Sequence, residues 1–134
     1  MRTIRLLNAA LLAALLAGSF LAWPVLPDRI PVHFGIDGAA DAWTRSTAVA
    51  WFALPVVALA LNVLVLGAAA LSTRNPRWIN LPGKPRLLAL PPERQQPVLL
   101  RLRAGLEALA PLITVIFSAI QLATFRAALG HDPR

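Results

Sequence analysis

Residues 48–71 read AVAWFALPVVALALNVLVLGAAAL, a run without a single charged side chain. The hydrocarbon core of a bilayer is about 30 Å thick, and a helix that rises 1.5 Å per residue crosses it in about 20 residues. Asn62 is the most polar residue in the run, so a helix formed here would have no face suited to water. The run predicts a membrane-spanning helix, and it decides the class of the fold.

Two further apolar stretches flank this one. Residues 6–26 carry no charge, and residues 106–129 carry Glu107 and Arg126 only near their ends, where long side chains reach the membrane surface. Hydrophobic residues make up 57% of the 134 positions, above the roughly 45–50% of soluble domains. We therefore predict an all-α integral membrane protein, a single membrane domain over residues 1–134 with three transmembrane helices.

Lys and Arg are distributed unevenly around the three stretches. Two precede the first stretch, two lie in residues 27–47 beside three Asp, seven lie in residues 72–105, and two lie near the C-terminus. Because loops rich in Lys and Arg stay in the cytoplasm, we expect the N-terminus and the basic loop 72–105 to be cytoplasmic. The outer loop 27–47 and the C-terminus then lie outside. The expected location is the inner membrane of a bacterial cell, with anionic headgroups of the bilayer as partners of the basic loop.

The start of the chain has a second interpretation. Residues 1–19 have the basic start, apolar run and Ala17-Gly18-Ser19 ending of a secretory signal. The apolar run continues through residues 20–25, which favours an uncleaved span. Cleavage would leave two spans instead of three.

Two sets of residues are candidates for helix packing. Ala10, Ala14, Gly18 and Ala22 recur every four positions and would form a smooth ridge for close approach of another helix, although an alanine-rich helix also produces such ridges by chance. Uncharged polar residues within spans more often join helices than bind substrates. We expect the Asn62 side of the second span to meet the face of the third that bears Thr114, Ser118 and Gln121.

The outer loop has the pattern of a small hairpin. Ile30, Val32 and Phe34 alternate with other residues at a period of two, and Asp37-Gly38 is a turn signal. We expect a short hairpin or tight loop against the outer membrane surface, with Trp23 and Trp43 as interfacial anchors. The candidate recognition residues of this loop are Pro27, Ile30, Pro31, His33, Phe34, Gly38, Asp41 and Trp43.

His33, Asp37 and Asp41 are residue types that ligate divalent metals. Their spacing is not diagnostic, the turn explains Asp37, and Asp41 suits bonds to loop amides. We keep the three as weak metal candidates and expect neither a bound metal nor a cofactor.

The stretch LPDRIPVHFGIDGAAD, residues 26–41, resembles the loop motif of a bacterial family of small membrane proteins known only as a domain of unknown function. The same motif is similar to one in sporulation-delay toxin immunity-type proteins, which have more spans than this chain can hold. The resemblance implies a helical membrane protein, with immunity or signalling roles in some relatives, and it implies no established chemistry.

The basic loop ends in a predicted amphipathic helix. Pro91-Pro92 suits a helix start, and Glu93 suits its positive end. The apolar stripe of this helix consists of Val98, Leu99, Leu102 and Leu106. It should lie at the interface and lead into the third span. Since the positive-inside bias accounts for the cations, we expect no nucleic-acid partner.

The expected function rests on the side chains that the spans and loops contain. The spans hold no central acid or base, and no serine lies in a nucleophile elbow, so we do not expect an enzyme. The leading hypothesis is a sensing, immunity or protein-interaction module that acts through its extracytoplasmic loop and binds another membrane protein or itself. The alternatives are an oligomeric transporter or channel component and an accessory subunit of a larger membrane complex.

Overall fold

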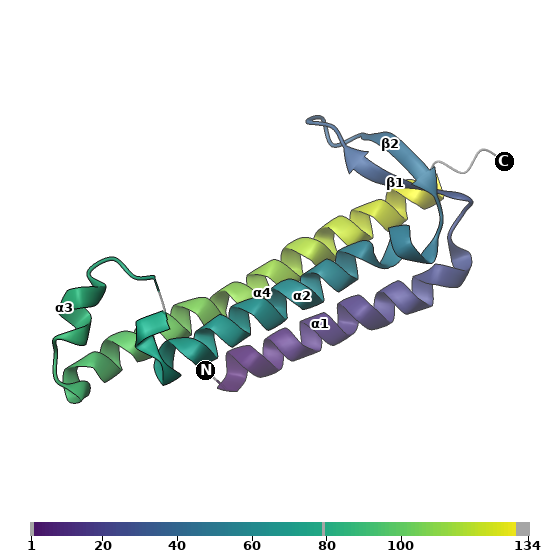
Figure 1. Cartoon of the computed structure of the whole chain (residues 1–134). Coiled ribbons are helices and arrows are strands. Elements are labelled where there is room, and N and C mark those ends of the chain that lie inside the picture. Colours follow the sequence, from purple (N-terminus) through teal and green to yellow (C-terminus); the bar gives the residue numbers. More distant parts are fainter. Residues whose placement is uncertain (1, 79, 131–134) are drawn as a thin grey trace.

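Three long helices form the body of the protein, as Figure 1 shows for the computed structural model, which describes residues 2–78 and 80–130. They are α1 (Arg2–Ala22), α2 (Ala48–Arg74) and α4 (Pro92–Gly130). Each is long and apolar enough to cross a bilayer. The three predicted spans are thus confirmed as helices of spanning length, which fits a multi-pass membrane protein.

The burial pattern of the bundle is the reverse of that in a soluble protein. Large apolar side chains such as Val63 and Leu64 are 66% exposed on α2. Polar side chains lie inside instead: Asn8, Ser19, Asn62, Ser72, Glu107, Thr114, Gln121 and Thr124 are all buried. Lipid is as apolar as leucine, so helices in a bilayer associate through packing and hydrogen bonds, and this distribution suits a lipid environment.

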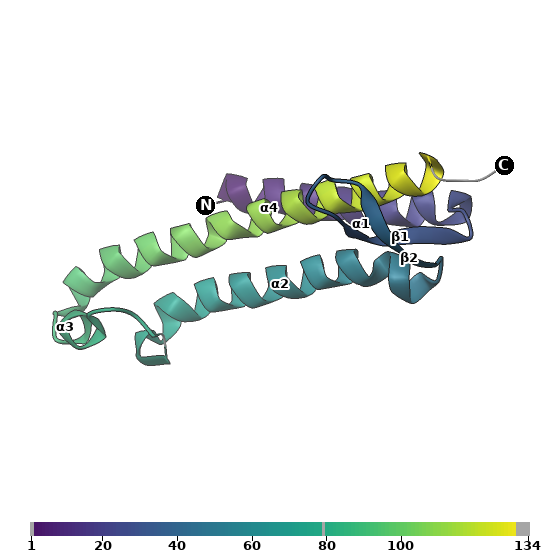
Figure 2. The ribbon, with the colours of Figure 1, turned by 90° about the horizontal axis from the view of Figure 1, so that it is seen from above.

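α4 is the helix that the other elements share. It packs against α1, α2 and the hairpin strand β1 (Arg29–Phe34). α1 and α4 run in the same direction, with α2 antiparallel to both (Figure 1). In the view from above, α4 crosses α1, and its N-terminal part extends beyond the start of α1 (Figure 2).

The helix boundaries differ from the predicted spans at the basic end. α1 begins at Arg2 and α2 continues to Arg74, because basic residues continue a helix while their side chains extend away from it. α4 begins at Pro92, at the predicted start, and runs without a break, so the predicted amphipathic segment and third span are one helix. The connection also holds the 3₁₀ turn η2 (Pro76–Trp78) and the short helix α3 (Lys84–Leu88), neither of which was predicted from the sequence.

The all-α prediction is wrong in the segment between α1 and α2. After the 3₁₀ turn η1 (Trp23–Val25), the chain forms an antiparallel pair, β1 and β2 (Ala40–Arg45), so the predicted hairpin is present. Alternating β-branched and aromatic residues favour the extended strand, and Gly38 supplies the positive φ of 78° at the turn. The pairing runs from Arg29↔Arg45 to Phe34↔Ala40, with irregular register on both sides of His33.

The hairpin does not stand free of the bundle. Ile30 packs into a small apolar core with Trp51 of α2 and Ala128 of α4, and all three are at most 2% exposed. Aromatic side chains extend this core, and Trp51 lies 6.2 Å from Phe125, measured between ring centroids. The hairpin is therefore fixed to the end of the bundle at which α4 finishes (Figure 1).

This core gives a prediction for hairpin docking. Replacing Ile30 with Ala should destabilise the docked hairpin by about 2–4 kcal/mol, because it removes buried methyl groups and leaves a cavity against Trp51. Ile36→Ala is the matched control, since Ile36 is fully exposed at 111% and the same atoms are lost without a cavity. Hydrogen exchange of residues 29–45 in nanodiscs measures the difference. Equal protection in the two variants would show that Ile30 does not anchor the hairpin.

Candidate functional site

The first part of the hairpin is occupied by its attachment to the bundle. Ile30 and Pro31 are buried, while Pro27, Phe34 and Trp43 are half-buried. The base of the hairpin is closed by Ser46, whose backbone N–H donates to the carbonyl of Asp28 over 2.9 Å and whose hydroxyl donates to the carbonyl of Pro27. Five of the eight predicted recognition residues are thus buried or half-buried.

The exposed residues of the strands and the tip make up the open face of the hairpin. His33, Gly38 and Asp41 are the predicted recognition residues that lie exposed there. Val32 and Ile36, which were not among the predicted recognition residues, are 56% and 111% exposed. The period-two alternation alone would place Val32 on the same face as Ile30, so its exposure was not predictable from the pattern. Val32 lies at the register irregularity between Pro31 and His33, where the regular alternation is interrupted.

The polar residues of the hairpin form a local network. His33 Nδ1 lies 2.6 Å from Asp41 Oδ1, and Asp37 Oδ1 accepts from the backbone N–H of Ala39 over 3.1 Å. A Cβ added at Gly35 would lie 2.9 Å from Asp37 Oδ1, so a side chain there would displace the turn. Within residues 2–78 and 80–130, no three His, Asp or Glu residues are grouped so as to hold a metal ion. The Asp37 carboxylate stabilises the turn through its hydrogen bond with Ala39.

A ring of three hydrogen bonds joins the three spans in their interior. Asn8 Nδ2 donates to Asn62 Oδ1 over 2.8 Å, Asn62 Nδ2 donates to Thr114 Oγ1 over 3.1 Å, and Thr114 Oγ1 donates to Asn8 Oδ1 over 2.9 Å. Asn62 also donates to the carbonyl of Ala58 over 2.9 Å. Asn62 and Thr114, expected to face each other, are therefore bonded, and Asn8 of α1 completes the ring.

The remaining candidate packing residues lie nearer the hairpin. Gln121 Nε2 donates to the backbone carbonyl of Trp51 over 3.2 Å, and Trp51 Nε1 donates to that of Ser19 over 2.8 Å, so α4, α2 and α1 are linked in series. Ser118 donates only within α4, to the carbonyl of Thr114. The small residues of α1 are more open, since Ala10, Ala14 and Gly18 are exposed and Ala22 is half-buried.

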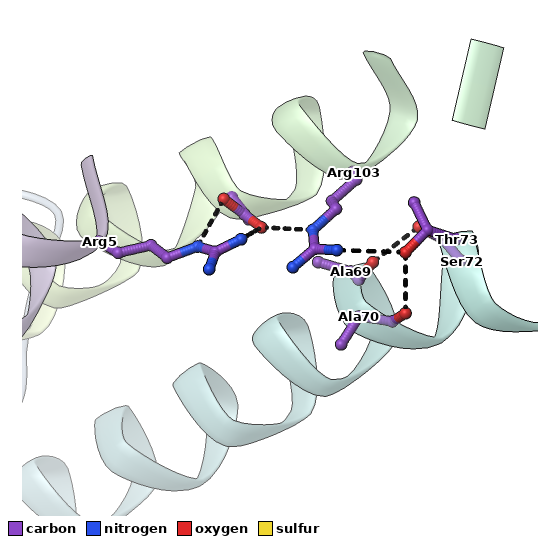
Figure 3. A network of polar contacts seen from close by, with 7 residues as sticks. Arg5, Ala69, Ala70, Ser72, Thr73 and Arg103 are labelled. Carbon is purple, nitrogen blue, oxygen red and sulfur yellow. Dashed lines mark hydrogen bonds and ion pairs between the residues drawn. The ribbon is translucent and has the colours of Figure 1, made fainter. Parts of the chain in front are cut away.

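An ionic network joins the same three helices at the end opposite the hairpin. Glu107 of α4 is 3% exposed and accepts from Arg5 of α1 through Nε over 2.9 Å and through Nη2 over 2.5 Å. Arg103 Nε donates to the same carboxylate over 2.8 Å, and its Nη1 donates to Thr73 of α2 over 3.2 Å. Figure 3 shows the chain of contacts from Arg5 to Arg103 and on to Thr73. The single carboxylate is shared by two arginines, which leaves a net charge of +1, and it links α4 to the first turns of α1 and, through Arg103, to the last turn of α2.

The hydrogen-bonded ring predicts that replacing the Asn62 side chain lowers the free energy of unfolding of the bundle. Asn62→Leu should destabilise the bundle by about 1–2 kcal/mol, because Asn8 and Thr114 each lose a partner in a dry interior. Val63→Leu is the control, since it changes the lipid-facing neighbour. Unfolding by dodecyl sulfate in mixed micelles, monitored by tryptophan fluorescence, gives the free energy of unfolding of each variant. A value for Asn62→Leu no larger than that of the control would contradict the role of the ring.

The ionic network predicts that Glu107 contributes more to the stability of the bundle than Glu93, which lies on the same helix. Glu107→Gln should destabilise the bundle by about 1–2 kcal/mol, since two arginines lose their shared anion while Arg5 stays partly hydrated. Glu93→Gln should change stability little, because Glu93 is exposed in the first turn of the same helix. The same unfolding assay compares the two variants at low and high salt. Equal effects of both substitutions would mean that the network does not stabilise the bundle.

Comparison with known proteins adds one match. A family model described as a domain of unknown function (DUF1648) matches residues 10–59. The matched segment holds the second half of α1, the whole hairpin and the first part of α2. No curated protein and no solved structure matches the chain. Over residues 10–59, then, the chain is similar to a domain whose function is not known.

Proposed function

We propose that this protein is a non-enzymatic membrane module that recognises another protein through its hairpin, in a sensing or immunity role. The observation that carries the proposal is a hairpin that is anchored at some residues and open at others. Ile30 fixes the hairpin to the bundle, while Val32 and Ile36 stay exposed. A partner meets a pre-formed surface and does not have to order a loop, which lowers the entropic cost of binding.

The chemistry of the open face suits a protein partner. Val32 and Ile36 are apolar and exposed, and the polar side chains of Arg29, His33 and Asp41 are exposed on the same hairpin. An apolar centre with a polar rim is the usual composition of a protein–protein interface. The resemblance of residues 26–41 to the loop of immunity-type proteins supports the same proposal.

The charge distribution supports the proposed orientation. The N-terminus and the basic segment with its seven Lys and Arg lie at the end of the bundle opposite the hairpin (Figure 1). In a cell membrane the basic end is proposed to face the cytoplasm and its anionic headgroups, and the hairpin the outside.

The proposal predicts a protein adduct at the hairpin tip. A photoreactive benzoylphenylalanine at position 36, introduced in the native membrane, should form a discrete adduct with a partner protein. The same group at position 63, on the lipid-facing side of α2, should not form that adduct. Adding Val32→Ser to the position-36 variant should reduce the adduct about tenfold, the effect of losing one well-packed apolar contact. Mass spectrometry of the adducts identifies what is attached.

Two results would reject the proposal. Adducts to lipid alone at position 36 would mean that the hairpin tip meets the bilayer, and identical protein adducts at positions 36 and 63 would mean that contact is unspecific. The orientation is checked in the same strain, because the chain has no cysteine. Ile36→Cys should react with a membrane-impermeant maleimide in intact cells, and Arg94→Cys should react only after lysis.

A further inference from the structure

A pocket at the base of the hairpin contains two charged side chains that do not hold the fold together. Its lining consists of Trp23, Leu26, Pro27, Asp28, Arg45 and Ser46. Asp28 and Arg45 are exposed, and neither side chain forms a hydrogen bond or an ion pair with another described residue. An acid and a base therefore line one open pocket without neutralising each other.

The pairing of the two strands adds a second positive charge at the same place. Arg29 of β1 lies directly opposite Arg45 of β2. Side chains of directly opposite residues lie on one face of a sheet, and like charges at such positions repel. Arg29 donates to the backbone carbonyl of Trp43 over 3.5 Å, and no carboxylate in residues 2–78 and 80–130 forms an ion pair with either guanidinium. An anion from outside the chain would reduce this repulsion.

The backbone fixes the place of these charges. The N–H of Ser46 donates to the carbonyl of Asp28 over 2.9 Å, and the Ser46 hydroxyl donates to the carbonyl of Pro27. These bonds hold the segment before β1 beside the residue that follows β2, so Asp28 and Arg45 stay at one end of the hairpin. A ligand meets an ordered backbone here, which lowers the entropic cost of binding.

The pocket lies where the first membrane-spanning segment ends. That segment covers Arg2–Val25, so Trp23 belongs to its last turn and Leu26 follows it. Tryptophan rings favour the boundary between hydrocarbon and headgroups. Leu21 and Val25 are 78% and 59% exposed and suit contact with acyl chains next to the pocket. The charged side chains of the pocket are therefore at the depth of phospholipid headgroups.

We infer that this pocket binds a phospholipid headgroup that carries a phosphate and a primary ammonium, as in phosphatidylethanolamine. The phosphate accepts from the Arg45 guanidinium, and Arg29 adds positive charge beside it. The ammonium donates to the Asp28 carboxylate. Trp23, whose ring centroid is 5.7 Å from that of Phe52, forms the apolar wall on the side of the acyl chains. This binding does not depend on the hairpin having a protein partner.

The two charges of the pocket distinguish this headgroup from two related ones. Phosphatidylglycerol has the phosphate but no cation, so it leaves Asp28 without a partner and is repelled by it. Phosphatidylcholine has a cation that cannot donate a hydrogen bond to Asp28. Only the ethanolamine headgroup among the three satisfies Arg45 and Asp28 together.

The test measures lipid binding to the wild-type protein in detergent micelles by native mass spectrometry. Dioleoyl lipids with ethanolamine, choline and glycerol headgroups are added separately at equal concentrations. The ethanolamine lipid should bind about fivefold more tightly than the choline lipid, the ratio expected for one exposed ion pair. It should also bind more tightly than the glycerol lipid, because Asp28 repels a headgroup that has only a negative charge.

Variants of the two charged residues test each half of the site. Asp28→Asn should remove the preference for ethanolamine over choline and should strengthen binding of the glycerol lipid, while Arg45→Gln should weaken binding of all three lipids. Asp37→Asn at the hairpin tip and Arg101→Gln on α4 are the matched controls, since both residues are exposed outside the pocket. Both controls should keep the wild-type ratio of ethanolamine to choline binding. The ratio is measured within each variant, so a general loss of stability does not imitate the effect.

Four results would overturn the inference. Equal binding of the ethanolamine and choline lipids to the wild type would show that Asp28 does not select the ammonium. Tighter binding of the glycerol lipid would show a site for anions only. An unchanged ratio in Asp28→Asn would place the lipid elsewhere. A protein adduct in place of a lipid adduct, formed in the native membrane by benzoylphenylalanine at position 23, would assign the pocket to a protein partner.

Discussion

The ring of Asn8, Asn62 and Thr114 is the contact on which the bundle depends. In lipid, apolar side chains gain little by turning inward, so the faces of the helices are chosen by the polar groups that need partners. Each helix contributes one member of the ring, and each member is hydrogen-bonded to both others. A rotation of any helix would leave polar atoms of the other two unpaired, which fixes the rotational setting of all three helices.

The two ends of the bundle are held in different ways. At the basic end, the buried Glu107 carboxylate joins arginines from α1 and α4, and the second arginine reaches α2. At the other end, Trp51 bonds to α1 and accepts from Gln121, and it provides the apolar surface on which Ile30 rests. The hairpin is therefore positioned by the same residue that links the helices, so its open face is presented at a fixed place on the bundle.

Much of this arrangement was predictable from local patterns. The spans follow from length and apolarity, and the hairpin follows from alternation and the Asp37-Gly38 turn, because each depends on residues adjacent in sequence. The partners of Asn62 were only half predictable. Thr114 was expected at a matching depth, whereas Asn8 was not assigned a partner, although it is one of the two polar side chains in residues 6–26. The register around His33 and the helix α3 depend on neighbouring elements and could not be predicted from local patterns.

The sequence by itself determined that this chain has three helices suited to a bilayer and a hairpin between the first two, since hydrophobic length and turn chemistry are local properties. Only the tertiary structure decided which residues of the hairpin are anchors and which are free. Ile30 and Ile36 are the same residue type in one loop, yet one is buried against Trp51 and the other is open. Burial depends on which surface the bundle brings beneath the loop, and that surface is assembled from helices distant in the sequence.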